Sequence, residues 1–95
     1  MRIISGLYKG RKIFEPTDKL TRPLKDLVRE SIFNILEHSS LSSKKIFKSN
    51  VLDLFSGSGS FGLECISRGA LKVIFVENYS KVLKILRKNI EKLNC

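Results

Sequence analysis

The fold of this chain is decided by the stretch Val51-Leu52-Asp53-Leu54-Phe55-Ser56-Gly57-Ser58-Gly59-Ser60-Phe61-Gly62. An apolar run with an acidic residue leads into a glycine-rich turn and then into a predicted helix. Glycine lets the backbone turn sharply and approach a ligand closely. The N–H groups that begin a helix attract polar or anionic ligands. The pattern is typical of a nucleotide-type cofactor site in a strand–helix–strand unit.

Two cofactors fit this turn. Residues 57–62 match the G-x-G-x-x-G pattern of dinucleotide sites. Asp53 lies four residues before the first glycine, where its carboxylate would repel a pyrophosphate. It would attract the sulfonium and ammonium of S-adenosylmethionine, so Asp53 favours that cofactor. A plain tight turn with solvated acids is the remaining alternative.

A second acid, Glu77, closes the apolar run 73–76 and lies 24 positions after Asp53. This distance suits the end of the next parallel strand. A carboxylate there can accept hydrogen bonds from both ribose hydroxyls of an adenosine. Glu77 therefore supports a nucleotide-type cofactor but does not distinguish the two candidates.

Composition limits the class of protein. The chain has 95 residues, of which 42% are hydrophobic, which indicates one small globular domain at most. No apolar run reaches the ~18 residues of a membrane span, and residues 1–10 lack a secretory signal, so a cytoplasmic protein without a membrane anchor is expected. Two cysteines and one histidine predict no metal site. Cys65 is predicted to be a buried thiol, and His38 to end a helix.

The charge balance points to a polyanionic partner. The net charge is +9, and residues 1–50 hold 11 bases and 5 acids. Nucleic acid is the commonest partner of such a surface. A basic surface that only maintains solubility is the alternative.

The N-terminal half is predicted to form an extension of the cofactor domain. Residues 1–15 resemble a β-hairpin with turns at Gly6 and Gly10. A helix is predicted from Pro23 to Glu37 because apolar residues recur at helical spacing. We therefore divide the chain into an extension at 1–38, a Ser- and Lys-rich linker at 39–50, and a cofactor-binding part at 51–95.

Residues 51–95 alternate between strand and helix patterns. Strands are predicted at 51–55 and 72–77, and helices at about 60–68 and 81–93. Gly69 is predicted to follow the first of these helices, and Ser80 to cap the second. This order implies a parallel, doubly wound α/β sheet. Such sheets usually have about five or six strands, so we expect 1–95 to be the N-terminal part of a longer domain.

Three stretches resemble the class I S-adenosylmethionine-dependent methyltransferases. The likeness is greatest to the bacterial methyltransferase D family, which methylates guanine N2 in 16S ribosomal RNA. Residues 1–12 resemble the N-terminal hairpin of that family. Its first helix is resembled by Thr21-Arg22-Pro23 with Asp26, Val28-Arg29-Glu30 and Ile32-Phe33-Asn34. Its cofactor motifs are resembled by Asp53–Gly59 with Gly62-Leu63-Glu64 and Phe75-Val76-Glu77. The resemblance implies a Rossmann-like methyltransferase fold, incomplete in this chain, with an N-terminal hairpin and helix extension.

The resemblance also implies roles for individual residues. The methionine part of S-adenosylmethionine would be held by Asp53, Phe55, Ser56, Gly57, Ser58 and Gly59. Glu77 would bind the ribose, and Asn78 would lie near the adenine. Thr21, Arg22 and Pro23 would cover the other side of the cofactor, and Arg22 could meet its carboxylate. RNA phosphates would face Arg2, Lys9, Arg11 and Lys12.

One family motif is missing. The catalytic Asp/Asn-Pro-Pro-Phe/Tyr does not occur in this sequence, whose two prolines are Pro16 and Pro23, so we assign no catalytic residue. Leu24 stands where the family often has a hydroxyl residue. We predict part of an RNA methyltransferase that acts on ribosomal RNA or the small ribosomal subunit and is a monomer when complete. A DNA amino-methyltransferase, an NAD-dependent oxidoreductase and a nonenzymatic RNA-binding fragment are the alternatives.

Overall fold

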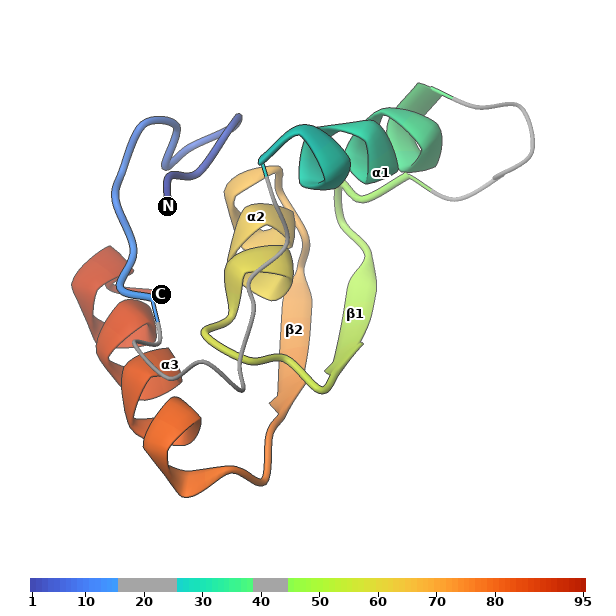
Figure 1. Cartoon of the computed structure of the whole chain (residues 1–95). Coiled ribbons are helices and arrows are strands. Elements are labelled where there is room, and N and C mark those ends of the chain that lie inside the picture. Colours follow the sequence, from blue (N-terminus) through green and yellow to red (C-terminus); the bar gives the residue numbers. More distant parts are fainter. Residues whose placement is uncertain (16–25, 39–44) are drawn as a thin grey trace.

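The computed structural model describes residues 1–15, 26–38 and 45–95 (Figure 1). Its elements, in chain order, are α1 (Asp26–His38), β1 (Asn50–Leu54), α2 (Ser60–Ser67), β2 (Lys72–Val76) and α3 (Ser80–Leu93). The last four lie within one residue of the predicted bounds, and α1 ends at His38 as predicted. The predicted start of that helix at Pro23 lies outside the described residues. No helix in these ranges is long and apolar enough to cross a membrane.

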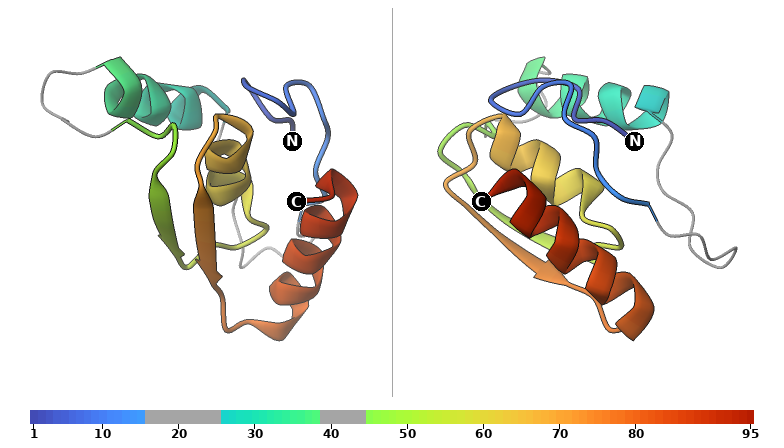
Figure 2. Two further views of the ribbon diagram at one scale, coloured as in Figure 1. Left: turned by 180° about the vertical axis from the view of Figure 1, so that it is seen from behind. Right: turned by 90° about the vertical axis from the view of Figure 1, so that its left-hand side faces the viewer.

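The two strands form a parallel pair, as predicted. Their register runs from Asn50 opposite Lys72 to Leu54 opposite Val76. α2 lies between the strands on one side and α3 with the N-terminal segment (residues 1–15) on the other (Figure 2). The fold is therefore a partial Rossmann-like α/β unit, in which two parallel strands are covered on one face by helices.

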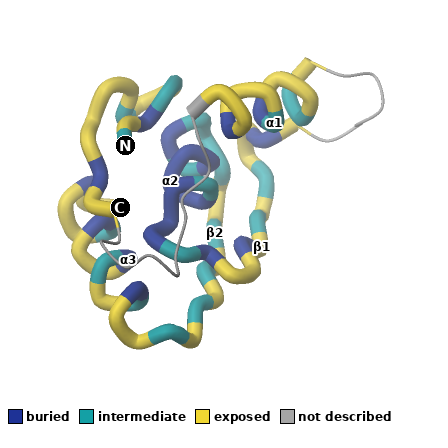
Figure 3. Tube along the Cα trace, in the orientation of Figure 1, coloured by how far each residue is buried: buried dark blue, intermediate teal, exposed yellow. Residues whose placement is uncertain are grey.

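Two apolar clusters hold the helices together, and α2 contributes to both. Most of α2 is accordingly buried (Figure 3). The first joins the N-terminal segment to α2 and α3 through Ile3, Ile13, Leu63 and Leu93. The second joins α1 to α2 through Phe33, Ile46 and Cys65. Cys65 is 1% exposed, which confirms the prediction of a buried thiol. Burial, followed by the negative charges nearby, raises its pKa to about 12.

The predicted N-terminal hairpin has less strand pairing than expected. Its arms form one antiparallel bridge, Arg2 with Lys12, and no continuous strand ladder. Three backbone bonds join them: Ile3 N–H to the Arg11 carbonyl at 3.0 Å, and Gly10 N–H to Ile3 and Ile13 N–H to Met1, both at 2.9 Å.

N–H groups in the turn between the arms donate to α2. Leu7 N–H donates to the Ser67 carbonyl at 2.7 Å and Tyr8 N–H to its hydroxyl at 2.9 Å. Two strands alone are marginally stable in water, and α2 supplies the acceptors that fix this segment.

The helix ends give one confirmation and one correction. Gly69 follows α2 with φ +100°, and Ala70 N–H donates to the Cys65 carbonyl at 2.9 Å, the arrangement predicted for a helix-ending glycine. The prediction that Ser80 caps α3 was wrong. Ser80 is the first helical residue, and the capping position is occupied by Tyr79 without a side-chain capping bond.

Candidate cofactor site

The predicted site residues meet at the carboxyl ends of the two strands. The glycine turn (residues 55–59) follows β1, and Glu77 follows β2. Because the strands are parallel and in register, both follow the same edge of the sheet. Ser56 N–H donates to the Val76 carbonyl at 2.9 Å and extends the ladder into the turn. Ligands of open α/β sheets bind at this edge.

The glycine turn has an unusual backbone. Phe55, Gly57 and Gly59 have φ values of +56°, +59° and +92°, in the left-handed region that favours glycine. Phe55 adopts this conformation without being glycine, and its side chain is 90% exposed. Strained backbone of this kind is concentrated at functional sites. At Gly59 a Cβ would also collide with Leu86 of α3, so the turn packs closely against that helix.

Glu77 connects the two strand ends directly. Its Oε1 accepts a hydrogen bond from Gly57 N–H at 2.9 Å, and its Oε2 accepts one from Tyr79 N–H at 3.0 Å. An ionised carboxylate can accept about four hydrogen bonds, so these two leave capacity for two hydroxyl groups. Asn78 is exposed next to Glu77. The acid and the turn, 20 residues apart in sequence, thus form one site.

Asp53 bonds to the first turn of α2, directly after the glycine turn. It is 8% exposed, and its Oδ2 accepts a hydrogen bond from Gly62 N–H at 3.1 Å. Gly62 is the third residue of α2, whose capping residue Gly59 has no side chain to accept such a bond. Burial raises the pKa of the Asp53 carboxyl, and the bond from Gly62 opposes this rise. The structure shows Asp53 holding the helix start; its contact with a cofactor cation stays a prediction.

The turn also contains a buried hydroxyl that suits a ligand. Ser56 and Ser58 are 8% and 4% exposed. The Ser56 hydroxyl is buried and has no hydrogen-bond partner among the described residues. A buried hydroxyl without a partner carries a cost of about 1–3 kcal/mol. A polar cofactor at this edge would satisfy it, so the donors and acceptors present fit a molecule such as S-adenosylmethionine.

Asn89 of α3, which was not predicted as a site residue, holds the glycine turn against that helix. Asn89 is fully buried on α3. Its amide nitrogen donates to the carbonyls of Ser58 and Phe14, both at 2.9 Å. Its oxygen accepts from Phe14 N–H at 2.6 Å. The available signal was its spacing with Val82, Leu86 and Leu93, which sets an amide in an otherwise apolar helix face.

Glu64 was noted only as part of a family motif, and its role in anchoring the N-terminal segment was not predicted. It is completely buried and accepts hydrogen bonds from Ile4 N–H at 2.8 Å and Ser5 N–H at 3.1 Å. Arg68 Nε lies 2.9 Å from the same carboxylate, and Arg68 Nη1 lies 3.0 Å from Glu37 of α1. This network joins α2 to the N-terminal segment and to α1.

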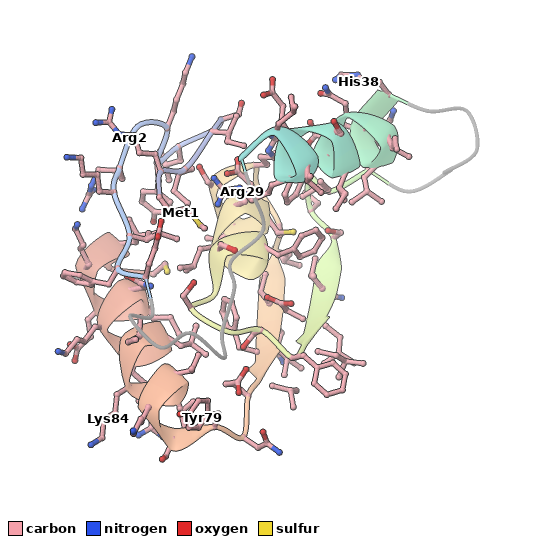
Figure 4. All side chains as sticks on the ribbon, viewed as in Figure 1. Met1, Arg2, Arg29, His38, Tyr79 and Lys84 are labelled. Atoms are coloured by element: carbon pink, nitrogen blue, oxygen red, sulfur yellow. The ribbon has the colours of Figure 1, made fainter. Side chains whose placement is uncertain are left out.

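The predicted RNA-facing bases lie on the anchored segment. Arg2, Lys9, Arg11 and Lys12 are all exposed, and Figure 4 shows Arg2 on the opposite side of the molecule from His38. Thr21, Arg22 and Pro23 lie outside the described residues. Among the residues that are described, no three His, Cys, Asp or Glu side chains gather as metal ligands would.

A separate concavity of about 340 Å³ lies away from this edge of the sheet. It opens between α2, β2 and α3 and is lined mainly by apolar side chains such as Ile66, Phe75 and Ile90. None of the predicted cofactor residues lines it. The candidate site is therefore the edge formed by the glycine turn and Glu77.

A glycine turn and a strand-end acid on parallel strands define the class of Rossmann-like cofactor-binding proteins to which methyltransferases belong. The chain belongs to the family described as conserved hypothetical protein 95, whose profile matches residues 1–95. It is 42% identical to the ribosomal RNA small subunit methyltransferase D of Haemophilus influenzae over 100% of this chain and 46% of that protein. It is 39% identical to the protein of the same name from Escherichia coli K12, over 100% of this chain and 45% of that protein.

Solved structures have the same fold. The chain superposes on yhhF from Escherichia coli with a TM-score of 0.81 and 37% identity, over 100% of this chain and 48% of that one. It superposes on the Thermus thermophilus hypothetical protein TTHA0928 with a TM-score of 0.78 and 26% identity, over 99% and 50%. The resemblance to the methyltransferase D family is confirmed. The chain spans about half the length of the relatives that it matches.

Proposed function

We propose that this chain provides the cofactor-binding part of an enzyme that transfers a methyl group from S-adenosylmethionine to guanine N2 of 16S ribosomal RNA. The observation that carries this proposal is the bond from Gly57 N–H to Glu77, which unites the two strand ends. The names of the relatives support the reaction class and the ribosomal RNA substrate.

The described residues would bind and orient the cofactor. S-adenosylmethionine supplies a methyl group on a positively charged sulfur. Glu77 would accept hydrogen bonds from the ribose hydroxyls, and the hydroxyl of Ser56 would bind the methionine part. The carboxylate of Asp53, close beneath the turn, would favour the positive charges electrostatically. Phe55, Gly57, Ser58 and Gly59 would shape the turn around the methionine, and Asn78 would lie near the adenine.

Other parts of the chain would complete the complex. Thr21, Arg22 and Pro23 would cover the cofactor, and Arg22 would pair with its carboxylate. Arg2, Lys9, Arg11 and Lys12 would contact phosphates of the small ribosomal subunit, which position the RNA without reading its bases. Rate enhancement would come mainly from holding the methyl group and the amine in line. We propose a cytoplasmic monomer for the complete protein and assign no residue of this chain to the chemical step.

Calorimetric titration of the full polypeptide encoded by the gene with S-adenosylhomocysteine tests the cofactor. We expect binding, and we expect Glu77→Gln to weaken it about tenfold, the equivalent of ~1.4 kcal/mol. Glu91→Gln, which changes an exposed acid of α3, should leave the affinity unchanged. Binding of NADH in place of S-adenosylhomocysteine would support an oxidoreductase and reject the proposal.

The acceptor is tested with small ribosomal subunits that lack the modification. We expect radioactive methyl from S-adenosylmethionine to enter 16S RNA at a guanine N2, identified by mass spectrometry of the nucleosides. Transfer to DNA alone would favour the DNA amino-methyltransferase, and transfer to no nucleic acid, despite cofactor binding, would reject the RNA substrate.

A further inference from the structure

The outward side of α3 carries five exposed bases, which we call the α3 basic face: Lys81, Lys84, Arg87, Lys88 and Lys92. The rotation of the helix is fixed by its buried residues, Val82, Leu86, Asn89 and Leu93. The bases therefore face solvent because the opposite side is packed. Glu91 is the single acid in α3.

The spacing of these bases forms a stripe along the helix. Lys81, Lys84, Lys88 and Lys92 follow one another at intervals of three or four residues, which brings side chains onto one side of a helix. Lys92 lies 11 positions after Lys81, a length of about 16 Å at the helical rise. Such a stripe suits an extended polyanion better than a single small anion.

The α3 basic face is continuous with the N-terminal segment. Arg11 Nη2 donates to the carbonyl of Lys92 at 3.0 Å. Lys92 Nζ lies 4.9 Å from the ring centre of Phe14, and Asn89 binds the backbone of Phe14. Figure 4 shows Arg2 and Lys84 on the same side of the molecule. Bases from two segments about 80 residues apart in sequence thus form one surface.

Among the described residues, the exposed bases are not spread evenly. Of the 12 exposed bases in the described ranges, nine lie on the α3 basic face or the N-terminal segment, and the other three are Lys45, Lys48 and Lys72. α1 has the opposite character, because its one arginine, Arg29, is buried while Glu30 is exposed. A charge that served solubility alone would not need this separation. The distribution favours a polyanion that contacts one side of the protein.

We infer that the α3 basic face extends the N-terminal segment into one surface that binds the phosphate backbone of RNA. The inference rests on the proposed function only for the identity of the polyanion. Lysine ammonium groups act as point charges, so this surface would position the RNA and leave base recognition to other parts of the protein.

The test compares two triple variants of the full polypeptide with equal loss of charge. Lys84→Gln, Arg87→Gln and Lys88→Gln remove the centre of the α3 basic face. The matched control, Lys45→Gln, Lys48→Gln and Lys72→Gln, removes three exposed bases outside α3 and the N-terminal segment. Binding to a 16S RNA fragment is measured over a range of salt concentrations. We expect the first variant to lower the salt slope by about 2, since each lost phosphate contact removes about 0.7–0.9.

Equal loss of slope in both variants would mean that only net charge matters, and an unchanged slope in the first would remove α3 from the interface. Either result overturns the inference. Affinity for S-adenosylhomocysteine must stay at the wild-type value in both variants, which verifies the fold. Failure of the wild type to bind that ligand would reject the proposed function, yet the two salt slopes would still test the surface.

Discussion

α2 and α3 lie on the same face of the strands but are held in different ways. In α2, six of eight residues are buried, and they include the polar residues Ser60, Glu64 and Ser67. In α3, four of 14 residues are buried, and Asn89 is the single polar one among them. α2 is enclosed by the strands, α1 and the N-terminal segment, whereas α3 packs by one stripe.

This difference shows what the charged residues of each helix do. The one charged residue of α2, Glu64, bonds to the backbone of Ile4 and Ser5 and to Arg68, which follows the helix, because a buried charge without partners is costly. Charged groups in α3 remain in water and are available to a partner. The polar residues of α2 therefore stabilise the fold, and those of the α3 basic face serve binding. Four measurements, on residues of the two helices and on Asp53, which bonds to the start of α2, test this contrast in order of decreasing effect on stability.

Glu64→Ala should cause the largest loss. It removes the acceptor of Ile4 N–H and Ser5 N–H and leaves Arg68 without its nearest partner. Removing one member of a buried ion pair costs about 3–5 kcal/mol. We expect the free energy of unfolding, measured by urea denaturation, to fall by this amount. Glu91→Ala on α3 is the matched control, with a change under about 0.5 kcal/mol; similar losses in both would contradict the contrast.

Asn89→Ala should have the next largest effect, because Asn89 is the one buried polar residue of α3 and in this respect resembles the buried polar residues of α2. The variant loses three hydrogen bonds to Phe14 and Ser58 and leaves buried backbone groups unsatisfied, at about 1–3 kcal/mol. We expect a loss of about 2 kcal/mol in urea denaturation. Asn34→Ala, at an exposed position on α1, is the control. A loss no greater than that of the control would mean that Asn89 does not fix the turn.

Asp53 should give wild-type stability a distinctive pH dependence. Burial raises its folded-state pKa above the ordinary value of 3.8, so the folded protein binds a proton more readily than the unfolded chain. The stability that this proton provides is complete below pH 3.8 and is lost as pH rises through the folded pKa.

The measurement for Asp53 is urea denaturation of the wild type and Asp53→Asn over a series of pH values. The free energy of unfolding of the wild type, relative to that of the variant, should increase as pH falls. A difference that is constant or decreases on acidification would show that the carboxyl of Asp53 is not disfavoured by burial.

Lys84→Gln should have the smallest effect. Lys84 is exposed on α3, and exposed substitutions usually change stability by less than about 0.5 kcal/mol. We expect urea denaturation of the variant to match the wild type within that range. A loss above about 1 kcal/mol would indicate that the α3 basic face stabilises the fold. The charged residues of α2 and α3 would then not differ in function.

Local sequence patterns predicted most of the fold. The glycine turn and the alternation of apolar runs located β1, α2, β2 and α3 within one residue, because these signals act over short distances. The position of Glu77 at the end of β2 was predictable in the same way. The bonds of Glu64 to Ile4 and Ser5 and those of Asn89 to Phe14 and Ser58 were not, since each joins residues at least 31 positions apart. The bonds from Leu7 and Tyr8 to Ser67 were not predictable for the same reason, because α2 is remote in sequence from that turn.

The bonds from Ile4 and Ser5 to Glu64 also affect the order of folding. They join residues 60 and 59 positions apart, so the segment synthesised first must wait for α2 before it can dock. At about 5–20 residues per second, a ribosome needs several seconds to make that stretch. We expect the N-terminal segment to be among the last parts to gain protection from hydrogen exchange, although it is the first to leave the ribosome.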